Sequence, residues 1–61
     1  MKVKDFLSTL RNEAVYVNIY DSRGVICTFE LHEWKLMEYR IQNANIAEWT
    51  FFPKCLRILI S

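Results

Sequence analysis

Two runs of alternating apolar and polar residues flank the only glycine of the chain, Gly24. Both runs are rich in β-branched and aromatic residues, which favour strands. The break between them reads Asp-Ser-Arg-Gly and supplies turn-forming residues. The pattern therefore predicts a β-hairpin from Ala14 to Leu31.

The turn predicts the register of this hairpin. A type I turn from Asp21, followed by a left-handed Gly24 in a G1 bulge, places Asp21 opposite the Gly24-Val25 pair. Tyr20 then faces Ile26, and Tyr16 faces Glu30. Since side chains alternate along a strand, one face is wholly apolar: Val15, Val17, Ile19, Cys27, Phe29 and Leu31. The other face is mixed: Tyr16, Asn18, Tyr20, Ile26, Thr28 and Glu30.

The hydrophobic period changes to that of a helix on either side of this hairpin. Four apolar residues at helical spacing predict a short first helix that ends near Asn12: Val3, Phe6, Leu7 and Leu10. A second helix is expected over His32 to Gln42, with an apolar stripe: Trp34, Met37 and Ile41.

A second hairpin is expected from Ile46 to Phe52 and from Leu56 to Ile60. Pro53 lies at a favourable turn position. A tight loop would pair residues along one apolar face: Phe51 with Leu56, Trp49 with Ile58, and Ala47 with Ile60. A wider loop is the alternative and would suit the strands better, because a type I turn through proline and lysine splays them. Both tryptophans, Trp34 and Trp49, are expected in the core.

The element order is therefore α-β-β-α-β-β, in one α+β domain over residues 1–61. Both hairpins offer an apolar face, and both helices have an apolar stripe to bury. The economical solution is one four-stranded, largely antiparallel sheet with two short helices on one face.

Composition narrows the class of protein. The chain has 61 residues, is 52% hydrophobic and carries a net charge of +1, so it is too apolar to be disordered and too weakly charged for polyanion binding through its field alone. Lys2 and Lys4 precede no signal-peptide core, and no membrane span is expected. A cytoplasmic location, in a bacterial host cell, is the expectation.

The sequence offers little material for catalysis. His32 is the one histidine, and a triad of Cys27, His32 and a glutamate is disfavoured because Cys27 faces the core. The two cysteines and the histidine lack the spacing of a metal site, and one glycine cannot build a phosphate-binding loop. We expect no enzyme activity, no cofactor and no metal.

The mixed hairpin face is the candidate binding surface. The residues expected to contact a partner are Tyr16, Asn18, Tyr20, Arg23, Ile26 and Thr28. Such tyrosines can stack on single-stranded bases or cover a protein partner, and they can also decorate a solvated face or pack in a homodimer. Nucleic acid ranks lowest, because no basic residues surround the tyrosines.

The opening stretch adds a resemblance. Met-Lys-Val-Lys-Asp-Phe-Leu-Ser-Thr-Leu-Arg-Asn, followed by Val-Tyr-Val-Asn-Ile-Tyr-Asp and a turn, resembles small proteins from phages and mobile elements of Gram-positive bacteria. Some of these are anti-CRISPR proteins that inhibit type II effector nucleases. The resemblance carries over no site residue. Several such inhibitors are strongly acidic, and the charge of +1 departs from that pattern, which argues against mimicry of DNA.

The leading hypothesis is a non-enzymatic protein-binding module that inhibits or modulates a bacterial protein, most concretely a CRISPR-type defence nuclease. One alternative is a small single-stranded nucleic-acid binder that uses Tyr16, Tyr20 and Arg23. The other is a homodimeric structural or assembly protein that pairs through the mixed face.

Overall fold

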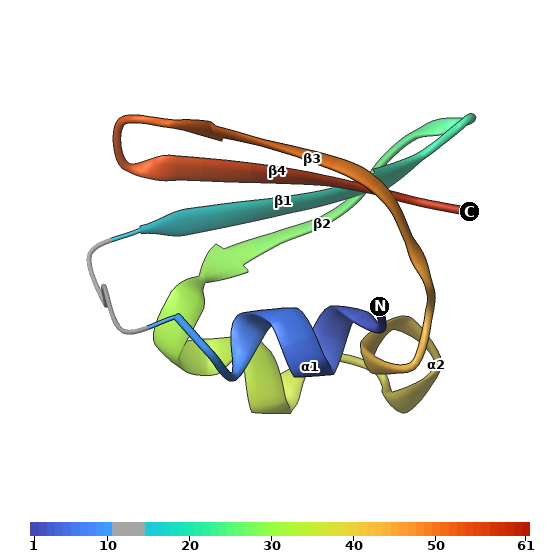
Figure 1. Ribbon diagram of the computed structural model, residues 1–61, viewed down its shortest axis with the longest axis horizontal. Coiled ribbons are helices and arrows are strands. Elements are labelled where there is room, and N and C mark those ends of the chain that lie inside the picture. Colours follow the sequence, from blue (N-terminus) through green and yellow to red (C-terminus); the bar gives the residue numbers. More distant parts are fainter. Residues whose placement is uncertain (11–14) are drawn as a thin grey trace.

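The computed structural model describes residues 1–10 and 15–61. Its helices are α1 (Val3–Leu7), the 3-10 helix η1 (Leu31–Leu36) and α2 (Tyr39–Gln42). Its strands are β1 (Tyr16–Asp21), β2 (Gly24–Glu30), β3 (Ile46–Phe52) and β4 (Cys55–Ile60). The described helices all lie on one side of the sheet, and none of them covers the other side (Figure 1). The expected α+β class and arrangement are confirmed.

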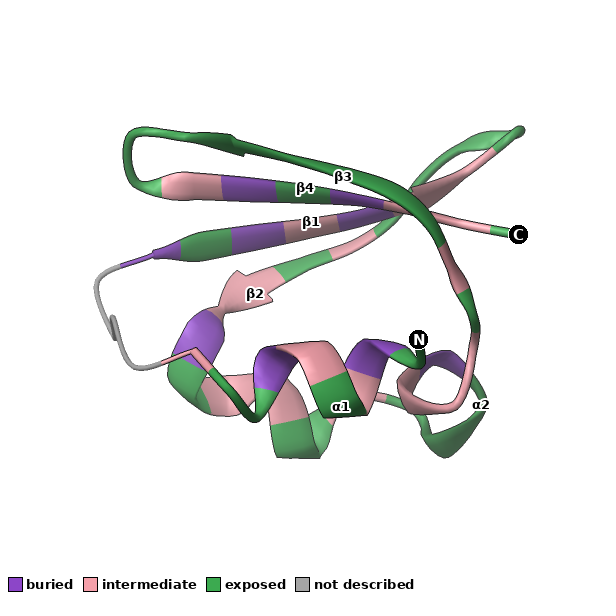
Figure 2. Cartoon of the chain, in the orientation of Figure 1, coloured by how far each residue is buried: buried purple, intermediate pink, exposed green. Residues whose placement is uncertain are grey.

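The sheet is mixed. Its strand order is β2-β1-β4-β3. The two hairpin pairs are antiparallel, and the hairpins meet through parallel pairing of β1 with β4. The central strands β1 and β4 carry buried residues, whereas β3 is exposed along most of its length (Figure 2).

The core lies between the sheet and the helices. Its buried residues are all apolar: Val3, Leu7, Val15, Val17, Ile19, Leu31, Ile41, Leu56 and Ile58. Val3 and Leu7 of α1 are buried and Phe6 packs beside them, so the apolar stripe of the first helix is confirmed over these three residues, while Leu10 contacts the core from beyond the helix. The helix ends at Leu7 and so is shorter than expected: Leu10 lies beyond it, and Asn12, the expected stop, lies outside the described residues. Among those residues, no helix is long and apolar enough to cross a membrane.

The first hairpin keeps the expected register from Tyr16 to Ile19 and departs from it at the turn. Tyr20 pairs with Val25 and Asp21 with Gly24, so the bulge falls at Ile26. The carboxylate of Asp21 accepts the Arg23 backbone N–H at 2.8 Å, and Gly24 has a φ of +126°. This closes the turn over two residues and moves the extra residue into the strand.

The single helix expected from His32 to Gln42 is wrong. The 3-10 helix η1 is followed by extended backbone at Met37 and Glu38, and α2 then begins. Three residues around the break contact the core: Leu31, Trp34 and Met37. Leu31 and Trp34 are three residues apart, and residues at that spacing lie directly in line in a 3-10 helix. Trp34 is half-buried against the core as expected.

The second hairpin confirms Phe51 opposite Leu56 and Trp49 opposite Ile58, but Ile60 pairs with Ile46 and not with Ala47. A shift in register lies between Ile46 and Glu48. Of the two alternatives for the loop, the structure has the tight one. Phe52 pairs directly with Cys55, and Lys54 takes a left-handed φ of +66°. That conformation suits the second central position of a type II turn, whereas a type I turn has a negative φ at that position.

The core placement expected for Trp49 is wrong. Its side chain is on the helix-covered side with Ile58, yet the residue is 52% exposed. Because β3 is an outer strand, the helices cover only part of it. Trp49 contacts Phe6 of α1, with ring centroids 5.1 Å apart.

Candidate protein interface

The helix-free face of the sheet, called the open face from here on, carries rows of side chains that cross the strands. One row follows the start of β1: Glu30, Tyr16, Cys55 and Phe52. The next row crosses the middle: Thr28, Asn18, Arg57 and Thr50. A third row lies near the first turn: Val25, Tyr20, Leu59 and Glu48. Aromatic, aliphatic and polar groups therefore share one uncovered surface.

Asn18 ties three strands together at the centre of the open face. Its side-chain oxygen accepts the hydroxyl of Thr28 on β2 at 2.7 Å. Its side-chain nitrogen donates to the sulfur of Cys55 on β4 at 3.3 Å. Both hydrogen bonds join residues that the strand pairing places side by side, so Asn18 links β1 to β2 and to β4 at the centre of the candidate site.

Tyr16 and Tyr20 flank Asn18 along β1. Tyr16 is 53% exposed. The ring of Tyr20 lies under the guanidinium of Arg57, which is 5.1 Å from the ring centroid. A cation stacked in this way is held by the ring quadrupole, while its N–H groups stay available to a carboxylate or carbonyl of a partner.

The structure brings together four of the six residues expected to contact a partner: Tyr16, Asn18, Tyr20 and Thr28. Ile26 is the extra residue of the bulge and is 38% exposed. Arg23 lies in the exposed turn beyond the strands. Its side chain therefore belongs to the rim of the open face.

Sequence reasoning missed the contribution of β4 to this site. Alternation along β4 puts Arg57 and Leu59 on the face opposite to the buried Leu56 and Ile58. Nothing in that alternation shows that β4 lies beside β1. The parallel pairing of Asn18 with Arg57 joins the two hairpins and puts a cation among the tyrosines.

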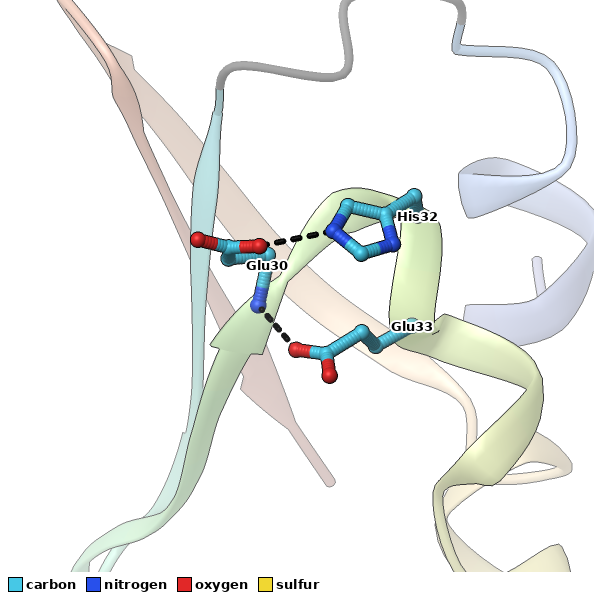
Figure 3. A group of neighbouring side chains, drawn as sticks. All are labelled: Glu30, His32 and Glu33. Atoms are coloured by element: carbon cyan, nitrogen blue, oxygen red, sulfur yellow. Dashed lines mark hydrogen bonds and ion pairs between the residues drawn. The ribbon is translucent and has the colours of Figure 1, made fainter.

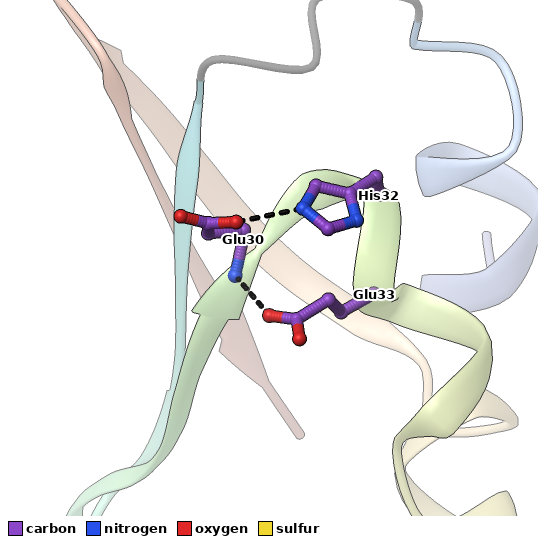
Figure 4. Close-up of polar contacts among 3 residues, drawn as sticks. All are labelled: Glu30, His32 and Glu33. Atoms are coloured by element: carbon purple, nitrogen blue, oxygen red, sulfur yellow. Dashed lines mark hydrogen bonds and ion pairs between the residues drawn. The ribbon is translucent and has the colours of Figure 1, made fainter.

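Glu30, His32 and Glu33 form a polar cluster where β2 enters η1 (Figure 3). The Nε2 atom of His32 lies 2.6 Å from a carboxylate oxygen of Glu30, and the Glu30 backbone N–H donates to Glu33 at 3.3 Å (Figure 4). Glu30 in turn accepts the backbone N–H of Glu33, which completes a capping box. The cluster thus starts the 3-10 helix. It is also the group in the described ranges with three metal-ligating atoms within 4.8 Å.

Cys27 is not assembled with this cluster. It pairs with Ile19 on the helix-covered side, whereas Glu30 pairs with Tyr16 on the open face. Burial raises the pKa of the Cys27 thiol, and the negative charge of Glu38 raises that pKa further. A raised pKa keeps the sulfur as a thiol at neutral pH, the form that is a poor nucleophile.

Comparison of the chain with protein-family models, with curated proteins and with solved structures gave no match.

Proposed function

We propose that this chain is a small, non-enzymatic protein-binding module that contacts its partner through the open face. The observation that carries the proposal is the stacked pair of Tyr20 and Arg57 beside the exposed Tyr16, on a sheet face that no helix covers. Tyrosine and arginine are enriched among residues that dominate binding energy in protein interfaces. Phe52 adds an aromatic group at the outer edge of the same surface.

The partner that we propose is a bacterial protein, and its most concrete form is a CRISPR-type defence nuclease that the module inhibits. This narrower proposal rests on the resemblance of the opening stretch to small proteins of phages and mobile elements. The near-neutral charge of +1 favours contact with a mixed protein surface over imitation of nucleic acid.

The test is binding of the purified chain to purified type II effector nucleases, followed by an assay of DNA cleavage. We expect Tyr16→Ala and Arg57→Ala to weaken binding about tenfold each, as truncation of a central interface residue does. Tyr39→Ala is the matched control, because Tyr39 is 75% exposed but belongs to the helix layer. Equal binding by all three variants would contradict the open face as the contact surface. Failure of every effector to bind would remove the nuclease as the partner.

A second candidate function is single-stranded nucleic-acid binding, which the position of Arg57 among the tyrosines favours. Aromatic rings can stack on bases while a cation meets the backbone. A labelled oligonucleotide titrated at low salt tests this function. Binding that survives Tyr16→Ala and Tyr20→Ala would exclude the sheet-face mechanism.

A further inference from the structure

The backbone N–H of Ile46, the first residue of β3, donates to the carbonyl oxygen of Met1, and beyond Ile46 the outer edge of β3 pairs with no strand in the described part of the chain. β3 is the last strand of the sheet order, and all its residues except Ile46 are exposed. Glu48 is its one charged residue. Natural proteins protect such edges with charges, prolines or bulges, because an open edge can pair with another strand. Between Glu48 and Phe52 the register is regular, so this stretch has none of the distortions that block pairing.

An apolar groove of about 190 Å³ lies beside this edge on the helix-covered side. Its walls include Phe6, Leu31, Leu56, Trp49 and Phe51. Trp49 is 52% exposed and Phe51 is 55% exposed. Two large aromatic rings therefore stand half in solvent next to a free strand edge.

The hydrogen-bond pattern between β3 and β4 determines which residues of β3 have backbone groups directed toward the open edge. In a hairpin with a two-residue turn, the residues that flank the turn exchange two backbone hydrogen bonds. Here these residues are Phe52 and Cys55. Antiparallel ladders alternate between bonded and non-bonded pairs. Trp49 and Phe51 therefore direct their backbone N–H and C=O groups away from β4, toward the open edge.

We propose that the β3 edge pairs with the β3 edge of a second copy of this chain, antiparallel and with the two-fold axis at Thr50. Trp49 then lies opposite Phe51 of the partner subunit and exchanges both backbone bonds with it. The two aromatic side chains form a cross-strand pair on the helix-covered side. Thr50 meets Thr50 of the partner subunit on the open face.

A second copy of the chain is the proposed partner because the β3 edge is complementary to itself. In this register Glu48 lies opposite Phe52 of the partner subunit, so no like charges are opposed along the ladder. Pro53, which has no backbone N–H, lies beyond these pairs and ends the ladder. The interface is isologous, and the outer strand β2 is distorted by its bulge at Ile26, so pairing closes at a dimer.

The surface available predicts a weak dimer. Trp49, Phe51 and Phe52 are each about half exposed. Fully buried aromatic residues cover about 150–250 Å² each, so two copies could cover up to roughly 600 Å² of aromatic surface. With the paired backbones added, the contact falls at the low end of specific interfaces. We expect a dissociation constant in the micromolar range.

Light scattering across a concentration series tests the proposal. As the concentration of the wild-type chain is raised to about 500 µM, its average mass should increase from 7.4 kDa toward twice that value. Thr50→Lys and Thr50→Glu each place like charges opposite one another at the two-fold axis, and each should raise the dissociation constant about fivefold. An equal mixture of the two variants should restore the dimer, because the opposed charges are then complementary. Native mass spectrometry identifies the mixed species.

Ser22→Lys is the charge-matched control, since Ser22 is exposed in the first turn, away from β3. It should leave the dimer unchanged, and circular dichroism checks the fold of each variant. A wild-type chain that stays monomeric overturns the proposal. So does a dimer that resists both Thr50 variants, or one lost with Tyr16→Ala, which would assign dimerisation to the open face. A mixture that fails to restore the dimer also contradicts the register.

Discussion

Asn18 shows how one polar side chain organises the open face. Its two side-chain hydrogen bonds join β1 to the strands on both sides. Asn18→Ala leaves the hydroxyl of Thr28 and the sulfur of Cys55 without these contacts. We expect a loss of about 1 kcal/mol in the free energy of unfolding, the usual net value of a hydrogen bond in a partly buried site. Urea denaturation measures it.

The double variant with Thr28→Val separates the contact from other effects of the Asn18 substitution. If the Asn18–Thr28 hydrogen bond contributes to stability, the sum of the losses in unfolding free energy for the two single variants should exceed the loss for the double variant. Additive losses would show that this bond contributes nothing measurable.

Cys27 predicts a pH dependence of stability. Burial, and then Glu38, raise the pKa of its folded thiol above the ordinary 9.0, so the folded state retains a proton that the unfolded state releases. Stability is unaffected below pH 9.0 and falls as the pH rises from there toward the folded pKa. Urea denaturation at pH 8 and pH 10 should show a larger loss for wild type than for Cys27→Ala. An equal loss in both chains would contradict the assignment.

Residue positions on the faces of the first hairpin could be predicted, because alternation carries that information. Val17 and Ile19 are buried and Tyr16 is exposed, as the pattern indicates. Trp49 could not be placed in the same way. Alternation shows on which face a side chain lies, but the exposure of that side chain depends on whether its strand is central or outer.

Among the elements, the two hairpin turns solve the same problem with different residues. Both turns place one residue at positive φ: Gly24 at +126° and Lys54 at +66°. Glycine adopts such a conformation freely, whereas a lysine there costs about 1 kcal/mol. Lys54→Gly should therefore stabilise the fold by up to about 1 kcal/mol, less the greater chain entropy of an unfolded glycine. Thermal unfolding followed by circular dichroism measures the change.

Gly24→Ala is the reciprocal substitution. An added Cβ meets no atom within 4 Å, so the expected destabilisation of about 1 kcal/mol or more comes from backbone strain alone. A neutral Gly24→Ala would mean that the turn relaxes to another conformation.

The break between η1 and α2 could not be predicted from amphipathicity alone. The stripe of Trp34, Met37 and Ile41 fits an α-helix, and the choice of a 3-10 segment depends on packing with the core. The side chain of Gln42 in α2 stabilises the break through hydrogen bonds to the backbone before it. Its side-chain nitrogen donates to the carbonyl oxygens of Lys35 at 3.2 Å and of Met37 at 2.7 Å, which satisfies groups that a continuous helix would have bonded itself.

At the scale of the whole molecule, stability depends on a small core. Leu7 is 1% exposed, and Leu36 is 83% exposed. Leu7→Ala should cost about 3 kcal/mol. A single core in a chain this short rarely supplies more than about 3–5 kcal/mol in total, so the variant should be largely unfolded at 25 °C. Leu36→Ala should be indistinguishable from wild type by circular dichroism and urea denaturation. A folded Leu7→Ala variant would show that another interaction, such as dimer formation, supplies much of the stability.

Strand order is the part of the architecture that the sequence left open. The turns at Gly24 and Pro53 mark each hairpin locally, but β1 and β4 are both apolar on one face and carry no mark of their partner. The candidate site could be predicted only in part for the same reason. Tyr16 and Tyr20 could be named from the sequence, whereas Arg57 becomes their neighbour only through the parallel pair.

That central parallel pair also governs how the chain can fold. Each hairpin closes through a two-residue turn, whereas the pairing of Tyr16 with Cys55 joins residues that lie far apart in the sequence. Because closing the longer loop costs more entropy, we expect the two hairpins to form first and then to join along β1 and β4. Substitutions at the β1–β4 seam should change the folding rate, while substitutions in either turn should act mainly on how readily each half forms. The same arrangement would let β4 of one chain pair with β1 of another, so high protein concentration during refolding would favour exchanged halves over correctly closed monomers.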